Sequence, residues 1–325
     1  MVTRAQVAAS KAIHRTTGPT FYVATRLLPR RVRHATYVLY AFFRIADEVV
    51  DDAGDASVER QRATLERLRA EALGERPTTD PVLAAFQEIR ERYDVSDAEV
   101  DEFVAAMEVD VEKRRYESYR ELEAYMGGSA VAVANMMTAI MRPADPEMAR
   151  PHARALGEAF QLTNFLRDVR EDVVERDRIY LPRTTRDAFG VDDEQVAALR
   201  MSEGFAGVVR TELERTEALY RRGVAGIRLL PPDCQFPVLL AAVLYAEHHR
   251  LIRERGYDVL STPPTLSRSR TLVLYARTRW HWLRHRDPET VFYAVSPVEP
   301  GPFDERARET TLLAPVRRSV SRLLR

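Results

Sequence analysis

Two segments of the sequence carry pairs of aspartates whose spacing suits a site for a metal-bound anion. In the first segment, four polar residues recur every three or four positions: Tyr40, Arg44, Asp47 and Asp51. On a helix they would fall within roughly 60° of one another, with the two carboxylates about 6 Å apart along the axis. Like charges at this spacing destabilise an isolated helix, and the residues around them are mostly apolar. Mg²⁺ is a suitable counterion, because it prefers oxygen ligands and is often held by one or two carboxylates together with substrate phosphates.

The second segment repeats this arrangement further along the chain. A helix would place four side chains on one face, within a wedge of about 80°: Gln161, Asn164, Asp168 and Asp172. Either pair alone could be a solvated acidic face with arginine partners, for which Arg167, Arg170 and Arg176 are available. Two such pairs, each accompanied by amide or Tyr and Arg groups, instead favour a cage for a metal-bound diphosphate.

The elements that must position these pairs are helices. Apolar residues recur at helical spacing in nearly every segment, and turn-forming residues interrupt them. The expected helices cover about 3–15, 30–53, 57–73, 80–93, 97–115, 118–141, 146–176, 202–229, 234–255 and 268–285. Only residues 290–298 resemble a strand. No linker long enough to separate two domains occurs before about residue 290. We therefore expect an all-α fold, with one domain over residues 1–290 and a short C-terminal appendage over residues 291–325.

The composition excludes several other classes of function. The 325 residues include 49 basic and 49 acidic side chains, so the net charge is zero and broad nucleic-acid binding is not expected. Cys234 is the single cysteine, which excludes an intrachain disulfide and a multi-cysteine metal site. The N-terminus lacks the apolar stretch of a secretory signal, and the longest uncharged run, residues 124–141, is better explained as a buried helix than as a membrane span. We expect a soluble, cytoplasmic protein.

These motifs resemble those of the squalene and phytoene synthase family, the head-to-head prenyl transferases. The matching segments, which span about residues 10–285, are TFYVATRLLP (20–29), YAFFRIADEVVDD (40–52), MEVDVEKRRYESYRELEAY (107–125), QLTNFLRDVREDVVERDRIYLP (161–182) and the region of Tyr245. The resemblance implies a single helical bundle of the isoprenoid synthase type with a central cavity. It also implies that the protein condenses two geranylgeranyl diphosphates through prephytoene diphosphate to phytoene, the first step of carotenoid biosynthesis, and releases diphosphate.

The same resemblance implies roles for individual residues. The implied ligands of Mg²⁺, or of Mn²⁺, are Asp47, Asp51, Asn164, Asp168 and Asp172, and the catalytic set adds Tyr40 and Arg44. The implied substrate-binding residues are Thr20, Phe21, Thr25, Tyr37, Tyr125, Val133, Gln161, Asn164, Arg167 and Tyr245. Metal ions and arginines would neutralise the departing diphosphate, while aromatic and apolar walls would shield a carbocation from water. Phe42, Phe43 and Phe160 are instead expected to pack in the core. The small residues of segment 127–134 could line the cavity or allow close helix packing, and both could hold.

Two other functions stay open on the sequence alone. A squalene or dehydrosqualene synthase would use farnesyl diphosphate, and squalene formation would also need a nicotinamide reductant. A non-catalytic family member could act as an assembly or lipid-binding factor, but such a protein would be expected to lose acidic residues, and all four aspartates are present. Thr25 favours the longer substrate, because relatives that form thirty-carbon products carry a bulky aromatic in its place.

Residues 268–286 combine arginines with tryptophans and could touch an anionic membrane surface. The side chains concerned are Arg268, Arg270, Arg277, Arg279, Trp280, Trp282, Arg284 and Arg286. A solvated face, or arginines paired with acids of other helices, explains the pattern at least as well. The expected partners are therefore small prenyl diphosphates, with a peripheral membrane contact as one alternative, and the sequence leaves the oligomeric state open.

Overall fold

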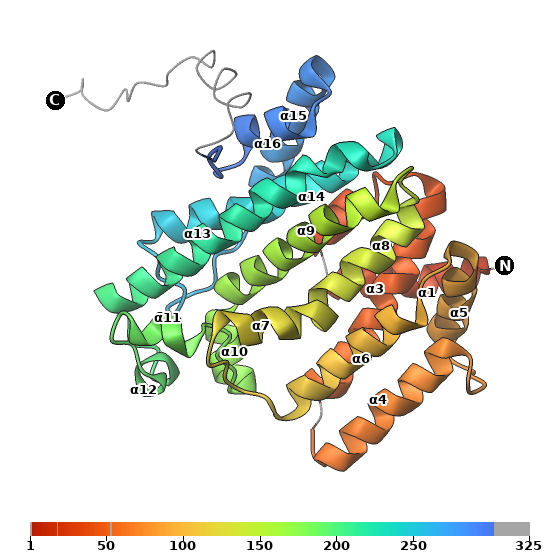
Figure 1. The fold of residues 1–325 in the computed structure, drawn as a ribbon, viewed down its shortest axis with the longest axis horizontal. Coiled ribbons are helices and arrows are strands. Elements are labelled where there is room, and N and C mark those ends of the chain that lie inside the picture. Colours follow the sequence, from red (N-terminus) through yellow and green to blue (C-terminus); the bar gives the residue numbers. More distant parts are fainter. Residues whose placement is uncertain (1, 18, 53, 302–325) are drawn as a thin grey trace.

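The computed structural model describes residues 2–17, 19–52 and 54–301 as a bundle of helices (Figure 1). The elements in chain order are α1 (Arg4–Thr17), α2 (Pro19–Thr25), α3 (Arg30–Asp51), α4 (Val58–Leu73), α5 (Pro81–Tyr93), α6 (Asp97–Glu112), α7 (Tyr119–Met126), the π-helix η1 (Gly127–Ala132), α8 (Val133–Met141), α9 (Pro146–Arg167), α10 (Val169–Arg176), α11 (Arg183–Asp187), α12 (Asp193–Ala197), α13 (Glu203–Ala225), the 3₁₀-helix η2 (Ile227–Leu229), α14 (Pro232–Glu254), α15 (Arg268–His285) and α16 (Pro288–Val295). In these described ranges no strand occurs, and one isolated β-bridge joins Arg115 to Ile179. The expected all-α fold is confirmed.

Side-chain caps begin many of these helices at the places that the turn residues predict. In each case a serine or aspartate oxygen accepts a hydrogen bond from a backbone N–H of the first turn, which would otherwise lack a partner. The capping residues are Ser57, Asp80, Ser96, Ser118, Asp145, Asp192, Ser202, Ser267 and Asp287.

The strand-like interpretation of residues 290–298 is wrong, because these residues belong mostly to α16. Asp287 accepts a hydrogen bond from the N–H of Thr290 at 2.8 Å, and Pro288 occupies the first helical turn. Phe292 is fully buried, and α16 packs against α14 and α15. Burial against two helices outweighs the β-propensity of this short run, which depends strongly on its surroundings. The expected boundary at residue 290 falls inside α16, so the division into a domain and an appendage stays a prediction, and residues 302–325 lie outside the described residues.

The single helix expected over residues 146–176 is divided into α9 and α10 at Asp168. The N–H of Asp168 donates to the carbonyl of Asn164 at 2.8 Å, and the N–H of Asp172 donates to the carbonyl of Asp168 at 2.9 Å. The hydrogen-bond ladder therefore continues, and the break lies in the dihedral angles of Asp168 (φ −102°, ψ 11°). Leu166 and Val169 on either side are buried in an apolar cluster that also contains Ile179, which anchors the junction.

The helix expected over residues 118–141 contains the π-helical turn η1 between α7 and α8. By length and composition the run Tyr119–Met141 could cross a membrane, but 56% of its apolar window is buried and it packs against α6 and α9. A Cβ atom on Gly128 would lie 2.2 Å from the carbonyl oxygen of Glu102, so this close approach requires glycine. Other residues of the segment, including Ala130 and Val133, face the central cavity, and both explanations of the small residues hold.

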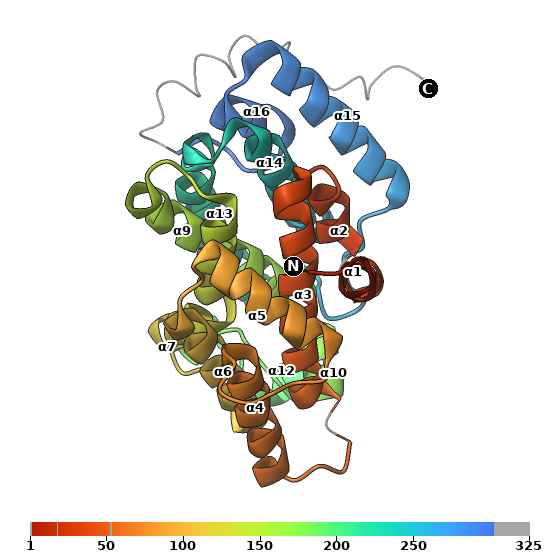
Figure 2. The ribbon, with the colours of Figure 1, turned by 90° about the vertical axis from the view of Figure 1, so that its right-hand side faces the viewer.

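The bundle surrounds a central cavity that contains the predicted site. Helix α9 packs against α8, α13 and α14, and α3 packs against α6 and α8 (Figures 1 and 2). Residues of α2, α3, α6, α8, α9, α10 and α14 line the cavity, which has a volume of about 740 Å³. The fold therefore brings the two aspartate-bearing segments, one on α3 and one at the α9–α10 junction, to a common space.

Candidate active site

The cavity is long and its two ends differ chemically. It follows α9 from Ala149 to Asp168, a length of about 28 Å at ~1.5 Å per residue. Apart from His152, the α9 wall is apolar as far as Phe160, and mostly polar residues follow from Gln161 to Asp168. The volume falls in the range of about 300–1,000 Å³ that is typical of small-molecule sites. Such a shape suits a ligand with a charged head and a long apolar tail.

Both aspartate pairs line the polar end. Asp47 and Asp51 come from α3, and Asp168 and Asp172 come from the α9–α10 junction, with Gln161 and Asn164 beside them. Among the described residues, no group of three His, Cys, Asp or Glu side chains is close enough to hold a metal ion. The arrangement fits an ion such as Mg²⁺, which retains several waters and bridges protein carboxylates to substrate phosphates.

The electrostatics of these groups also fit a divalent cation. Burial and the neighbouring charge of Asp51 raise the pKa of Asp47 to about 7. Burial and the charge of Asp168 raise the pKa of Asp172 to about 8. The Oδ1 atom of Asn164 is buried without a hydrogen-bond partner. A cation between the pairs would relieve the repulsion and provide a partner for the amide oxygen, so the residues present fit Mg²⁺ or Mn²⁺.

Arginines pair with three of the four aspartates. Arg178 donates a hydrogen bond to Asp51 at 3.0 Å. Arg176 lies 3.4 Å from Asp51 and donates a hydrogen bond to Asp172 at 3.3 Å. Arg167 donates to both oxygens of Asp168, at 2.7 and 2.5 Å. Sequence reasoning identified Arg167, treated Arg176 only as a partner of a solvated acidic face, and missed Arg178. These guanidinium groups lie where they could also donate to phosphate oxygens.

Arg44 and Tyr40 line the same end of the cavity with other partners. Arg44 donates to Glu48 at 3.2 Å and lies 3.9 Å from Asp52. The ring of Tyr40 stacks on His14 at a centroid distance of 3.9 Å. His14 was not predicted from the sequence, and burial lowers its pKa to about 4, so the imidazole is neutral at neutral pH.

An aromatic group lines the cavity between the polar and apolar ends. The ring centroids of Phe21 and Tyr245 are 4.6 Å apart, those of Phe160 and Tyr245 are 4.9 Å apart, and those of Phe21 and Phe160 are 5.3 Å apart. Phe21 and Tyr245 agree with the predicted wall. Phe160 and Phe43 were expected only to pack in the core, but they also line the cavity, whereas Phe42 is fully buried in the core as expected. Such faces can stabilise a carbocation.

Tyr125 lines the cavity and holds an aspartate that sequence reasoning missed. Its hydroxyl donates to Oδ2 of Asp110 at 2.5 Å, and Arg178 donates to the Asp110 carbonyl at 2.8 Å. Burial raises the pKa of Asp110 to about 6. Asp110 has no second aspartate at helical spacing, so the pattern that identified the two pairs could not find it. Asp110 and Tyr180 both line the cavity.

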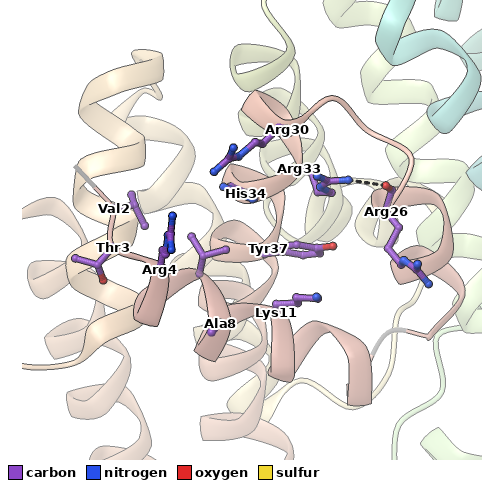
Figure 3. A pocket seen from close by; sticks show the side chains of 11 residues that line it. Val2, Thr3, Arg4, Ala8, Lys11, Arg26, Arg30, Arg33, His34 and Tyr37 are labelled. Atoms are coloured by element: carbon purple, nitrogen blue, oxygen red, sulfur yellow. Dashed lines mark hydrogen bonds between the residues drawn. The ribbon is translucent and has the colours of Figure 1, made fainter.

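The remaining predicted residues separate into three groups. Thr25 and Val133 line the apolar part of the cavity. Tyr37 does not line it and instead borders a separate pocket of about 570 Å³ between α1 and α3 (Figure 3). The side chain of Thr20 lies outside the described residues. The cavity also contains His248, which was not predicted, and burial lowers its pKa to about 4.

Known proteins are similar to this chain over most of its length. A phytoene synthase of Rhodobacter capsulatus is 32% identical over 282 residues, which cover 86% of this chain and 82% of that protein. A phytoene synthase of Cereibacter sphaeroides is 34% identical over 284 residues, covering 84% and 79% of the two chains. Among solved structures, a dehydrosqualene synthase with a bound ligand superimposes with a TM-score of 0.78 at 25% identity, covering 87% of this chain and 98% of that one. A squalene synthase from Alicyclobacillus acidocaldarius shares the fold, with a TM-score of 0.68 at 24% identity over 78% of this chain and 95% of that one.

The family-level match covers both aspartate pairs and the aromatic group. The profile of squalene/phytoene synthases matches residues 14–270, which include every lining residue of the cavity's polar end described above. The chain therefore belongs to the squalene/phytoene synthase family and is an enzyme of the prenyltransferase type.

Proposed function

We propose that this protein condenses two molecules of geranylgeranyl diphosphate head to head, through prephytoene diphosphate, to give phytoene. The observation that supports this most is the cavity itself, which joins two facing aspartate pairs to one long apolar lining. In the first step one substrate loses diphosphate, its C1 bonds to the double bond of the second substrate, and a proton leaves to give the cyclopropane. In the second step the remaining diphosphate leaves, the skeleton rearranges, and another proton leaves.

The polar end of the cavity binds and orients the diphosphates. Mg²⁺ or Mn²⁺ held by Asp47, Asp51, Asn164, Asp168 and Asp172 would supply Lewis-acid stabilisation of the leaving group. Arg176 and Arg178 can turn from aspartates to phosphate oxygens without crossing the cavity, because they already face it. Charge-assisted hydrogen bonds of this kind stabilise the separated diphosphate more than the intact ester, which lowers the barrier to ionisation.

The aromatic group and the apolar lining protect the carbocation. Phe21, Phe160 and Tyr245 present ring faces next to the polar end, where the cation forms after C–O cleavage. Beyond them the lining includes Val133, Ala149 and Leu156, whose alkyl groups cannot capture the cation. The prenyl chains extend along α9 toward Leu156 and Ala149.

Incubation of the purified protein with labelled substrates tests this function. We expect radiolabelled geranylgeranyl diphosphate and Mg²⁺ to yield a forty-carbon hydrocarbon without a reductant. A thirty-carbon product from farnesyl diphosphate at a higher kcat/KM would instead identify a dehydrosqualene synthase, and a requirement for a nicotinamide reductant would identify a squalene synthase. No product from either substrate would favour the non-catalytic alternative.

Thr25→Phe is expected to shorten the cavity for the prenyl chain. Thr25 is buried, lies on α2 four residues after Phe21, and lines the cavity with it. A hydrophobic site discriminates by about 1–3 kcal/mol per methylene, so we expect the ratio of kcat/KM for geranylgeranyl over farnesyl diphosphate to fall about tenfold or more. The control is Thr16→Phe, an exposed position on α1. An unchanged ratio with both activities retained would show that Thr25 does not limit chain length.

We also propose that the protein is cytoplasmic and contacts the membrane peripherally through α15, where its hydrocarbon product could leave. Leu272, Trp280 and Leu283 are 68%, 53% and 55% exposed and fall on one helical face. Arginines flank this face, and Leu274 and Trp282 on the opposite side are buried against the bundle. The segment just before α15, residues 264–266, lines the central cavity. An exposed apolar stripe among arginines is typical of a helix that lies in an anionic interface.

Vesicle co-sedimentation tests this contact. Vesicles containing phosphatidylglycerol are expected to bind the protein. Leu272→Ser with Trp280→Ser should weaken binding about tenfold or more, because the membrane would no longer bury these two apolar side chains. Met148→Ser is the matched control, because Met148 is an exposed apolar residue on α9, 57% accessible. Equal binding by the wild type, the double variant and the control would show that α15 does not form the membrane contact.

A further inference from the structure

A second concave site lies between α1 and α3, outside the central cavity. It has a volume of about 570 Å³. Figure 3 shows side chains of α1 on one side, side chains of α3 in the middle, and Arg26 from the turn after α2 on the other side. Its basic lining residues are Arg4, Lys11, Arg26, Arg30, Arg33 and His34. We call this site the basic pocket. Among the described residues that line it, none is an aspartate or a glutamate.

The cations of the basic pocket lack counter-charges in the part of the chain that the structure describes. None of its four arginines or Lys11 forms an ion pair with a described carboxylate, and the contact found is from Arg33 to the backbone carbonyl of Arg26, at 3.0 Å. Arg31, their neighbour on α3, is different: it pairs with both oxygens of Asp233 and does not line the pocket. The chain therefore neutralises the arginine outside the pocket and leaves those inside it unpaired.

The backbone makes these positions unfavourable for cations. Arg4 is the first residue of α1, Arg30 is the first residue of α3, and neither helix has an acidic residue in its first turn. A helix N-terminus carries a partial positive charge, so basic side chains there reduce stability, whereas an anion is favoured. Burial and the charges of Arg30, Arg33 and Lys11 lower the pKa of His34, which reports the same concentration of positive charge. A bound anion would satisfy the side chains and both helix ends together.

We propose that the basic pocket is a second anion site that binds a phosphate-bearing group, either free diphosphate or the phosphate of an anionic lipid headgroup. The four guanidinium groups and one ammonium group carry more positive charge than one monovalent anion can neutralise. Arginines also suit the paired oxygens of a phosphate group. The site is separate from the aspartate end of the central cavity. The rings of Tyr22, Tyr37 and His14 lie between them, with centroid distances of 5.7 to 6.0 Å, and His14 contacts Tyr40 on the cavity side. The proposal does not depend on the identity of the prenyl substrate.

Calorimetric titration with inorganic diphosphate, in chelator and at low salt, tests the proposal. Chelation removes the metal ions that would carry diphosphate to the aspartates, which otherwise repel it. We expect saturable binding of about one diphosphate per chain, and about tenfold or greater weakening in Arg30→Gln with Arg33→Gln. Lys11→Gln, which leaves α3 unchanged, should weaken binding about threefold or more. Binding should also weaken steeply as salt is raised.

Arg31→Gln is the matched control, because it removes a paired arginine from the same helical turn. It should change diphosphate affinity by less than about threefold, since its charge is already compensated by Asp233. Turnover should be unchanged in the double variant, because no residue of the basic pocket lines the central cavity. No saturable binding by the wild type, or an equal loss in Arg31→Gln, would overturn the proposal.

Vesicles distinguish the two sources of the phosphate. If the double variant binds phosphatidylglycerol vesicles about tenfold more weakly than the wild type, and diphosphate competes with the vesicles, the ligand is a lipid headgroup. If vesicle binding is equal in both proteins while calorimetry shows the loss, the ligand is a free phosphorylated anion. Each result supports the anion site, and the titration with inorganic diphosphate remains the measurement that can overturn it.

Discussion

Asp47→Asn, Asp51→Asn, Asp168→Asn and Asp172→Asn are each expected to lower turnover about a thousandfold or more while the helical bundle stays folded. Each carboxylate faces the polar end of the cavity. Losing a metal ligand removes part of a stabilisation that amounts to several kcal/mol, and each ~1.4 kcal/mol is tenfold in rate. The measurement is single-turnover rate with geranylgeranyl diphosphate at saturating Mg²⁺, together with the melting temperature of each variant. Asp52→Asn is the control, because Asp52 is exposed and does not line the cavity.

Thermal stability separates a metal ligand from a structural aspartate. Because burial and Asp51 raise the folded-state pKa of Asp47 to about 7, the stabilisation from protonating Asp47 is present at low pH and is lost as pH rises through 7. In chelator, Asp47→Asn should therefore melt a few degrees above the wild type at pH 8, and the difference should shrink as the pH falls and vanish only below the unfolded-state pKa of about 3.8. A lower melting temperature at pH 8 with near-normal activity would contradict the ligand role.

The helical faces at the site could be predicted from the sequence because they depend on local geometry. Gln161, Asn164, Asp168 and Asp172 all line the cavity, as the helical period requires. The prediction survives the break at Asp168, since the backbone hydrogen bonds continue through it and keep the four side chains on one side. The same reasoning placed Phe21 and Thr25 together, because α2 is helical there.

Contacts between distant segments could not be predicted in this way. Arg178 is 127 residues from Asp51 along the chain and pairs with it only because α3 and the segment that follows α10 face the same cavity. Asp110 lies in a mostly apolar helix, and its role becomes visible only when Tyr125 and Arg178 surround it. The family resemblance implied that Tyr37 binds the substrate, but Tyr37 lines the basic pocket and not the central cavity. The helical period of the sequence shows which side chains share a face of one helix. Which other segments that face contacts depends on how the helices pack, and the sequence period does not give this.

Removal of divalent cations is expected to abolish turnover and leave the protein folded. After dialysis against a chelator, turnover should fall about a thousandfold or more, and added Mg²⁺ or Mn²⁺ should restore it. The fold should persist because Arg176 and Arg178 already compensate Asp51 and Asp172, and Arg167 compensates Asp168. The measurement is product formation and the melting temperature before and after dialysis.

Arg176→Gln shows whether arginine and metal neutralise the same charges. Arg176 contacts Asp51 and Asp172, one from each pair. Without it, these carboxylates lose a partner, so Mg²⁺ should raise the melting temperature of the variant more than that of the wild type. The control is Arg62→Gln, whose ion pair with Glu112 lies on the surface, and the increment from Mg²⁺ should equal the wild-type value. In the dialysis experiment, full activity of the wild-type protein in chelator would show that turnover does not need a metal ion. An equal increment in Arg176→Gln and the wild type would mean that the cation binds where Arg176 has no influence, away from the space that the two aspartate pairs share.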